Sequence, residues 1–382
     1  MPETYAKNKS ISKEEALAMV KKHFGRIMKS RNEIPQVYTE EPEQEGQRRV
    51  ILKRAGQQGV VGVAHKTPAA THEDAPAFMV LSSILSSGKN SRFYKKITDK
   101  GLTTSVFIWD SLFRDPGLFA VYANLTPGTE HEDVEEIIMA EYEEIKRNGV
   151  SEEEVNKAKA QLVANMKFRQ DGSYMVAGSL NEAIASGDWT LYTRYEEMVS
   201  AVTAEDIKSV VERYFLEDLS TVGHFIPKST GNQGARRGPS SAIELEEMKQ
   251  KHFSTSEENN EGLLLAQIED SEPTEGVRLL TLKRGSGVVT FSGSFLGGDI
   301  YAPNTNPRVP DVVVSMLDQG TTKNSKFEIS SQLEGAGARL SFSNGKARVG
   351  FGGKFLSEDM DLVVGLLAEQ LKVPAFDSEE LK

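Results

Sequence analysis

The sequence has no cysteine among its 382 residues, which excludes disulfide bonds, thiolate metal sites and cysteine nucleophiles. No apolar run approaches the roughly 20 residues of a membrane-spanning helix, so no membrane span is predicted. The first ten residues, MPETYAKNKS, lack the hydrophobic region of a secretory signal peptide. The 45 basic residues are outnumbered by 56 acidic ones, and the net charge of −11 argues against a nucleic-acid partner.

The residues that are present are typical of a soluble globular protein, with 38% hydrophobic and 26% charged side chains. The length predicts two or three domains. A capping box, Ser12 with Glu15, begins a helix that ends at Gly25. One amphipathic helix needs a partner surface. Residues 1–48 are therefore predicted to be the C-terminal remnant of a preceding domain plus a polar linker.

A complete α+β domain is predicted over residues 49–228. Strands are expected at about 102–109 and 117–125, separated by the turn Asp115-Pro116-Gly117. A long helix is expected over about 132–148, followed by helices that begin at Ser151 and Thr203. The Ser-, Gly- and Asn-rich residues 229–262 are predicted to be a second linker.

Residues 263–382 are predicted to be an incomplete second copy of this domain. The stretch Leu85 to Phe93 is echoed by Leu317 to Phe327, about 230 positions later, and in both an Asn-Ser pair follows a glycine. In both stretches an apolar helix stops at a glycine, and an Asn-Ser pair begins the next helix. The chain closes on Ser-Glu-Glu, a helix start signal with no helix behind it. We call 49–228 the first copy and 263–382 the second copy.

Four segments resemble, in order, the pitrilysin/insulinase-type zinc peptidases. They are Ser87–Ile97, Lys100–Phe107, Gly149–Ala160 and Ala201–Ile207. The resemblance implies repeated two-layer α+β domains of the pitrilysin and mitochondrial-processing-peptidase type, each an antiparallel sheet covered by helices. It also implies chemistry in a first domain, where His-x-x-Glu-His holds Zn²⁺ and its Glu activates water. An Arg and a Tyr from the other half assist.

Carried over residue by residue, the resemblance predicts that this chain lacks the catalytic groups. Asp311 and Ser315 stand where the two zinc-binding histidines would be, and Val314 replaces the general base. Thr98 and Thr104 stand at the Arg and Tyr positions. We therefore expect no catalytic residues, no metal site and no bound cofactor in this chain, with Zn expected in a missing catalytic domain.

The six histidines include no pair spaced four residues apart. Neither His-Glu-x-x-His nor the inverted His-x-x-Glu-His is therefore present. His72-Glu73 and His131-Glu132 begin like such a motif but lack the second histidine. We expect both to be solvent-exposed residues at helix starts.

Two functions follow from the resemblance. The chain is either a non-catalytic portion of a zinc metalloprotease, forming part of its peptide-binding chamber, or an inactive family member that serves an active peptidase as partner subunit or scaffold. In both cases we expect no activity of the chain alone. The expected partners are a peptide or unfolded protein substrate and a domain or subunit that carries the zinc motif. Which residues bind substrate is unknown. The compartment also stays open, with the bacterial periplasm or cell envelope as the candidate.

Overall fold

The computed structural model describes residues 11–30, 42–110, 112–170, 172–228, 268–283, 285, 287–302 and 306–381. The chain divides into two compact units, Met1–Glu43 and Gln44–Lys382. In the described part of the first unit, helix α1 (Lys13–Phe24) begins with the predicted capping box of Ser12 and Glu15. The predicted linker 229–262 lies outside the described residues, and the predicted domain boundaries stay predictions.

The first copy is built on a five-stranded sheet in the order β1-β5-β2-β4-β3. Its strands are β1 (Arg48–Ala55), β2 (Val60–Thr67), β3 (Thr103–Asp110), β4 (Gly117–Leu125) and β5 (Ser220–Lys228). Neighbouring strands are antiparallel, as predicted, except for the parallel pair of β1 and β5. That pair joins the beginning of the copy to its end, so the sheet is mixed at one edge.

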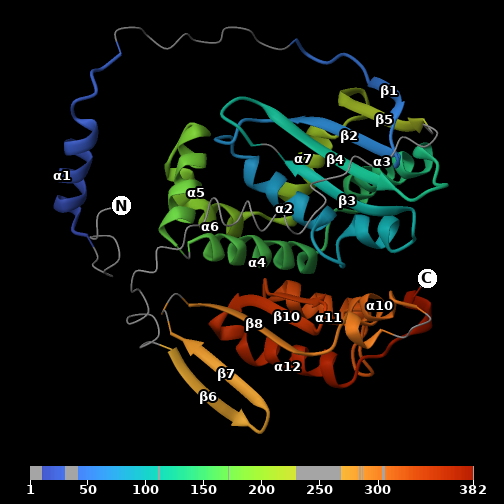
Figure 1. Cartoon of the computed structure of the whole chain (residues 1–382). Helices are drawn as coiled ribbons and strands as arrows, with labels where there is room; N and C mark the ends of the chain where they lie inside the picture. Colours follow the sequence, from blue (N-terminus) through green and yellow to red (C-terminus); the bar gives the residue numbers. More distant parts are fainter. Residues whose placement is uncertain are drawn as a thin grey trace. The chain divides into compact units, whose positions relative to one another are not determined.

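Three helices cover one face of this sheet: α2 (Ala75–Ser86), α3 (His131–Asn148) and α7 (Ala204–Tyr214) (Figure 1). Burial alternates along β2, whose inward side chains include the fully buried Val61 and Val63. In β4, Phe119 and Val121 are also fully buried. Each such side chain contributes about 1.5–3 kcal/mol by leaving water. The core of the copy therefore lies between the sheet and this helix layer.

Further helices extend the first copy. They are η2 (Tyr94–Thr98), α4 (Glu152–Arg169), α5 (Ser173–Ala185), α6 (Thr190–Ala201) and the short η3 (Glu217–Leu219). The η2 segment is a π-helix where the sequence predicts an ordinary helical turn over about 91–97. Helices α5 and α6 are not predicted from the sequence, because each buries one side chain and so shows little apolar periodicity.

The second copy contains an antiparallel sheet in the order β8-β10-β9 and a separate hairpin of β6 and β7. Its strands are β6 (Ile268–Thr274), β7 (Val277–Leu282), β8 (Val288–Leu296), β9 (Arg339–Asn344) and β10 (Arg348–Leu356). Its helices are η4 (Asp299–Tyr301), α10 (Val309–Met316), α11 (Lys326–Gly335), η5 (Ser357–Asp359), α12 (Met360–Lys372) and η6 (Ser378–Leu381). The order β8, α10, α11, β9, β10, α12 repeats the order β2, α2, η2, β3, β4, α3.

Across the described residues, every helix is too short or too polar to cross a membrane.

Candidate functional site

The three positions of the degenerate zinc motif lie on α10. Asp311 accepts a hydrogen bond from Asn344 Nδ2 at 2.7 Å, and this bond lowers the pKa of the Asp311 carboxyl. Ser315 donates its hydroxyl hydrogen to the carbonyl oxygen of Val312 at 2.8 Å. Val314 points into the core of the second copy, with 6% of its surface exposed. Each side chain is thus engaged locally, and within the described ranges no three His, Cys, Asp or Glu side chains gather as a metal site. The lack of catalytic zinc stays a prediction.

The two positions of the degenerate Arg/Tyr pair lie at one edge of the first copy. Thr98, the last residue of η2, shares a hydrogen bond with Thr103 at 3.1 Å between hydroxyl oxygens. Thr104 in β3 accepts a hydrogen bond from Gln58 Nε2 at 2.6 Å and donates to the Asn124 carbonyl oxygen. Both threonines therefore fasten the β3 edge, and neither has a charge for a developing oxyanion.

The two His-Glu pairs differ from each other. His72 is exposed, as predicted, and its Nδ1 accepts a hydrogen bond from the Asp74 backbone N–H. His131 is half-buried rather than exposed, because its Nε2 contacts the Phe225 carbonyl oxygen at 2.8 Å. Its ring lies 5.3 Å from that of His224, whose Nε2 contacts the Glu135 carboxylate at 2.7 Å. The prediction for His131 is wrong, since this histidine joins α3 to β5.

The face of the five-stranded sheet that these helices leave open carries large apolar side chains. Phe107 and Trp109 of β3 are about half exposed and lie opposite Tyr122 and Ala120 of β4. Phe107 stacks on Tyr122 with ring centroids 5.3 Å apart. We call Phe107, Trp109, Leu118 and Tyr122 the aromatic patch. An exposed apolar patch of this kind is a candidate binding surface. Sequence alternation alone does not tell which face of the sheet remains open.

The two copies are held together by the segments that repeat in the sequence. Asn90 Nδ2 donates to the Phe327 carbonyl oxygen at 3.1 Å, and Lys89 Nζ donates to the Asp318 carbonyl oxygen at 3.0 Å. Lys326, which is 8% exposed, places Nζ 2.6 Å from carboxylate oxygens of both Asp99 and Glu380. The recurring segments, in which an Asn-Ser pair follows a glycine, therefore contribute to the joint between the copies.

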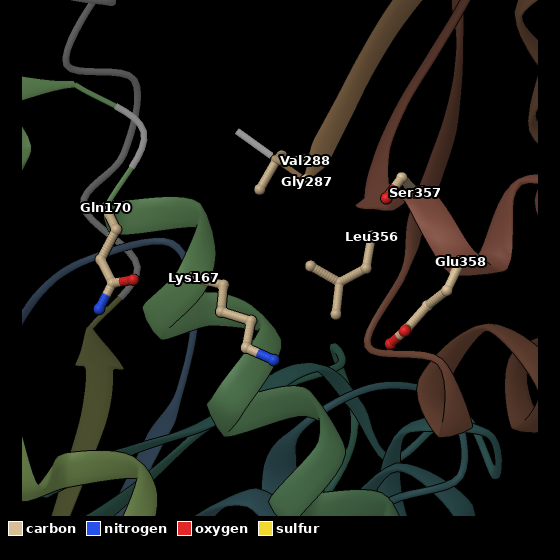
Figure 2. Close-up of a pocket in the computed structure, with 7 residues that line it drawn as sticks. All are labelled: Lys167, Gln170, Gly287, Val288, Leu356, Ser357 and Glu358. Carbon is tan, nitrogen blue, oxygen red and sulfur yellow. The ribbon is translucent and has the colours of Figure 1, made fainter. Parts of the chain in front are cut away.

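A cavity of about 540 Å³ lies between the end of α4 and the strand ends of the second copy. Its lining residues are Lys167, Gln170, Gly287, Val288, Leu356, Ser357 and Glu358. Figure 2 shows Lys167 and Glu358 extending into the same space from opposite sides. The lining offers one cation, one carboxylate and an apolar floor, but no histidine or cysteine. This composition suits contact with a polar chain segment better than acid–base chemistry.

One buried network was not predicted from the sequence. Arg92, directly after the Asn-Ser turn, donates to both carboxylate oxygens of Glu154 at 2.7 and 2.8 Å and to Glu141 at 2.8 Å. Glu141 is fully buried and also pairs with Lys96. The bonds to Arg92 and to the Ser151 cap outweigh burial and lower the pKa of Glu154 to about 2. The network ties η2 to α3 and α4.

Comparison with known proteins identifies relatives of this chain. Residues 10–162 match the family model of the peptidase M16 inactive domain. The zinc protease PqqE of Helicobacter pylori is 27% identical over 215 residues, which cover 55% of this chain and 48% of that protein. An uncharacterized zinc protease of Mycobacterium leprae is 30% identical over 155 residues, 40% of this chain and 35% of that protein.

A solved structure agrees with these sequence matches. The crystal structure of a protease from Helicobacter pylori has a TM-score of 0.54 and 26% identity, covering 57% of this chain and 53% of that one. The chain thus spans about half the length of these Helicobacter relatives. Both the resemblance and the repeated α+β fold predicted from the sequence are confirmed. Residues 10–162 thus match the inactive domain of the pitrilysin/insulinase-type (M16) zinc peptidases, and the chain is similar to a non-catalytic portion of these proteins.

Proposed function

We propose that this chain forms part of the wall of a peptide-binding chamber in a zinc metalloprotease whose Zn²⁺ is held by another domain or subunit. The observation that carries the proposal is the aromatic patch on the open face of the five-stranded sheet. A soluble domain that leaves Phe107, Trp109 and Leu118 about half exposed side by side gains from covering them with a partner. An extended peptide supplies both apolar side chains and backbone groups for such a surface.

The chemistry of the patch favours an unfolded peptide over a rigid folded partner. Aromatic rings accept many side chains without a fixed pattern of charges. The edge strand β3 lies beside the patch and can extend its hydrogen bonding to a peptide backbone. The expected substrate class is therefore a peptide or unfolded protein segment. The alternative role, an inactive partner subunit, uses the same surface and differs in where the zinc motif is encoded.

The two tryptophans of the chain allow a matched test. Trp109 lies in the patch and is 52% exposed, while Trp189 lies at the start of α6 and is 56% exposed. We expect Trp109→Ala to weaken binding of a fluorescein-labelled unstructured peptide about tenfold in an anisotropy titration. Trp189→Ala should leave the dissociation constant within about twofold. Equal effects of the two substitutions, or no binding by the wild-type chain, would refute the proposal.

A further inference from the structure

Strand register shows which side chains share the open face of the five-stranded sheet, the face opposite the helix layer. Residues that are paired on neighbouring strands lie on the same face. One row of paired residues crosses the whole sheet on the open face, from β3 to β1: Trp109, Ala120, Ala64, Thr221 and Arg48. The aromatic patch and Arg48 therefore belong to one surface.

The charged side chains that the five strands place on this face are all basic. Arg48 and Arg54 of β1 share the face, and Lys66 of β2 is paired with Leu118 of the aromatic patch. The described strands β1 to β5 contain one acidic residue, Asp110, and it lies on the face that the helices cover. The open face is thus positive, although the whole chain has a net charge of −11.

The surface between the aromatic patch and β1 is low. The row next to that of Trp109 runs through Phe107, Tyr122, Gly62, Gly223 and Val50. A Cβ placed on Gly223 would meet no atom of the described residues within 4 Å. Because neighbouring strands lie about 4.8 Å apart, the two ends of a row are about 19 Å apart. An extended segment of about six residues spans that distance.

We propose that the open face selects peptide segments in which Asp or Glu stands near an apolar side chain. This inference rests on the proposed function, because it specifies which peptides that surface takes. The apolar side chain of the peptide packs on the aromatic patch, and its carboxylates lie toward Lys66 and Arg48. The same cations repel basic segments, so charge selects in both directions.

The spacing of the charges favours a peptide over a nucleic acid. The three cations are spread over a surface about 19 Å wide and are separated by apolar and small side chains. A nucleic-acid strand carries a phosphate about every 3.4 Å, so most of its phosphates would have no cation on this face. A peptide with a few carboxylates matches the sparse pattern of charge.

The first test varies the peptide. Three fluorescein-labelled peptides share one apolar anchor and carry Glu, Gln or Lys at the flanking positions. In anisotropy titrations of the full chain at low salt, we expect the Glu peptide to bind about fivefold more tightly than the Gln peptide, and the Lys peptide to bind most weakly. Salt at about 0.5 M should reduce the preference for Glu to within about twofold, because it screens exposed charges.

The outcomes separate this inference from the proposed function. If the three peptides bind equally and Trp109→Ala weakens each of them, the selection by charge is wrong and the peptide-binding surface stands. If none of the three binds, the proposed function itself is refuted. Tighter binding of the Lys peptide, or of a labelled single-stranded oligonucleotide, would also overturn the inference.

The second test varies the protein. Lys66→Gln and Arg48→Gln should each weaken binding of the Glu peptide about threefold and leave the affinity for the Gln peptide unchanged. Lys53→Gln is the matched control, because Lys53 lies on β1 but is paired with Ile226 on the opposite face. A variant with a damaged fold would weaken both peptides alike, which circular dichroism verifies. If Lys53→Gln lowers the preference for Glu as much as the other two, the open face does not provide the selection.

Discussion

Among individual residues, His65 is an ionisable group buried in the core of the first copy. It lies on the inner side of β2 and is 1% exposed, with its ring edge-on to Tyr142 at 5.4 Å and 4.9 Å from Phe215. Burial lowers the pKa of His65 to about 4, and the charge of Lys146 lowers it further, against a weak opposing contact with the Leu216 backbone. The folded protein therefore holds this imidazole neutral throughout the mildly acidic range.

This histidine should make the first copy sensitive to acid. Between about pH 6.5 and pH 4 the unfolded chain binds a proton at His65 and the folded chain does not, so folding stability falls by up to about 3 kcal/mol as the pH drops. We expect His65→Phe to flatten the pH dependence of the unfolding free energy in urea titrations over that window. The exposed His72→Gln serves as control and should keep the wild-type slope. A His65→Phe protein with an unchanged slope would show that another group causes the acid sensitivity.

Arg92 should stabilise the first copy through its geometry as well as its charge. Replacement by Met leaves the fully buried Glu141 with Lys96 as its remaining cation and removes the bidentate contact to Glu154, at a cost of about 3 kcal/mol. Arg92→Lys keeps the charge but cannot bond both carboxylates in the same way, so we expect a smaller loss of about 1–2 kcal/mol. Urea unfolding measures both. If Arg92→Met costs no more than the nearby Lys95→Met, the network has little energetic weight.

For whole helices and strands, the sequence predicted the boundaries that turn and capping residues determine locally. The turn Asp115-Pro116-Gly117 and the alternation around it gave the bounds of β3 and β4 to within a residue. The capping boxes at Ser151 and Thr203 located two helix starts. Nothing local indicates that β1 pairs with β5, since 165 or more residues separate them and β1 is exposed along its whole length.

For the candidate site, the sequence could predict which catalytic groups are missing but not which residues form the exposed patch. Asp311, Val314 and Ser315 could be aligned with a known motif, because that motif sits at a fixed distance from the Met-Leu-x-x-Gly turn. The aromatic patch could not be foreseen. Alternation puts Phe107 and Trp109 on one face of β3, but the helix layer that decides which face stays open comes from residues distant in the chain.

One buried lysine, Lys326, contributes two ion pairs to the joint between the copies. Burial lowers the pKa of Lys326, but hydrogen bonds to Asp99 and Glu380 outweigh this effect and the net shift is upward. We expect Lys326→Met to leave both carboxylates without their cation and to release α11 from η2. Hydrogen exchange should show about a tenfold faster exchange of α11 amides, with β2 and β4 unchanged. Lys323→Met, an exposed change in the same turn, should have no effect, and faster exchange throughout the first copy would instead indicate general destabilisation.

At the scale of the whole molecule, we expect this chain to bind peptide without activating water for its cleavage. Hydrolysis of an amide by this family needs two imidazoles and a carboxylate around Zn²⁺. The positions that would supply them hold Asp311, Ser315 and Val314, of which Ser315 and Asp311 are engaged with neighbours and Val314 is buried. Peptide binding and peptide cleavage should therefore separate in this chain.

We expect the purified chain to contain clearly less than one zinc per polypeptide after dialysis and to show no o-phenanthroline-sensitive cleavage of the peptide that it binds. Inductively coupled plasma mass spectrometry and a fluorogenic peptide assay measure the two quantities on one sample. Addition of a partner chain that carries His-x-x-Glu-His should raise cleavage above that of the partner alone, and Trp109→Ala should reduce the increase, because the aromatic patch would no longer hold the substrate. Stoichiometric zinc with cleavage by this chain alone would overturn its assignment as non-catalytic, whereas normal stimulation by the Trp109→Ala protein would move the substrate surface elsewhere.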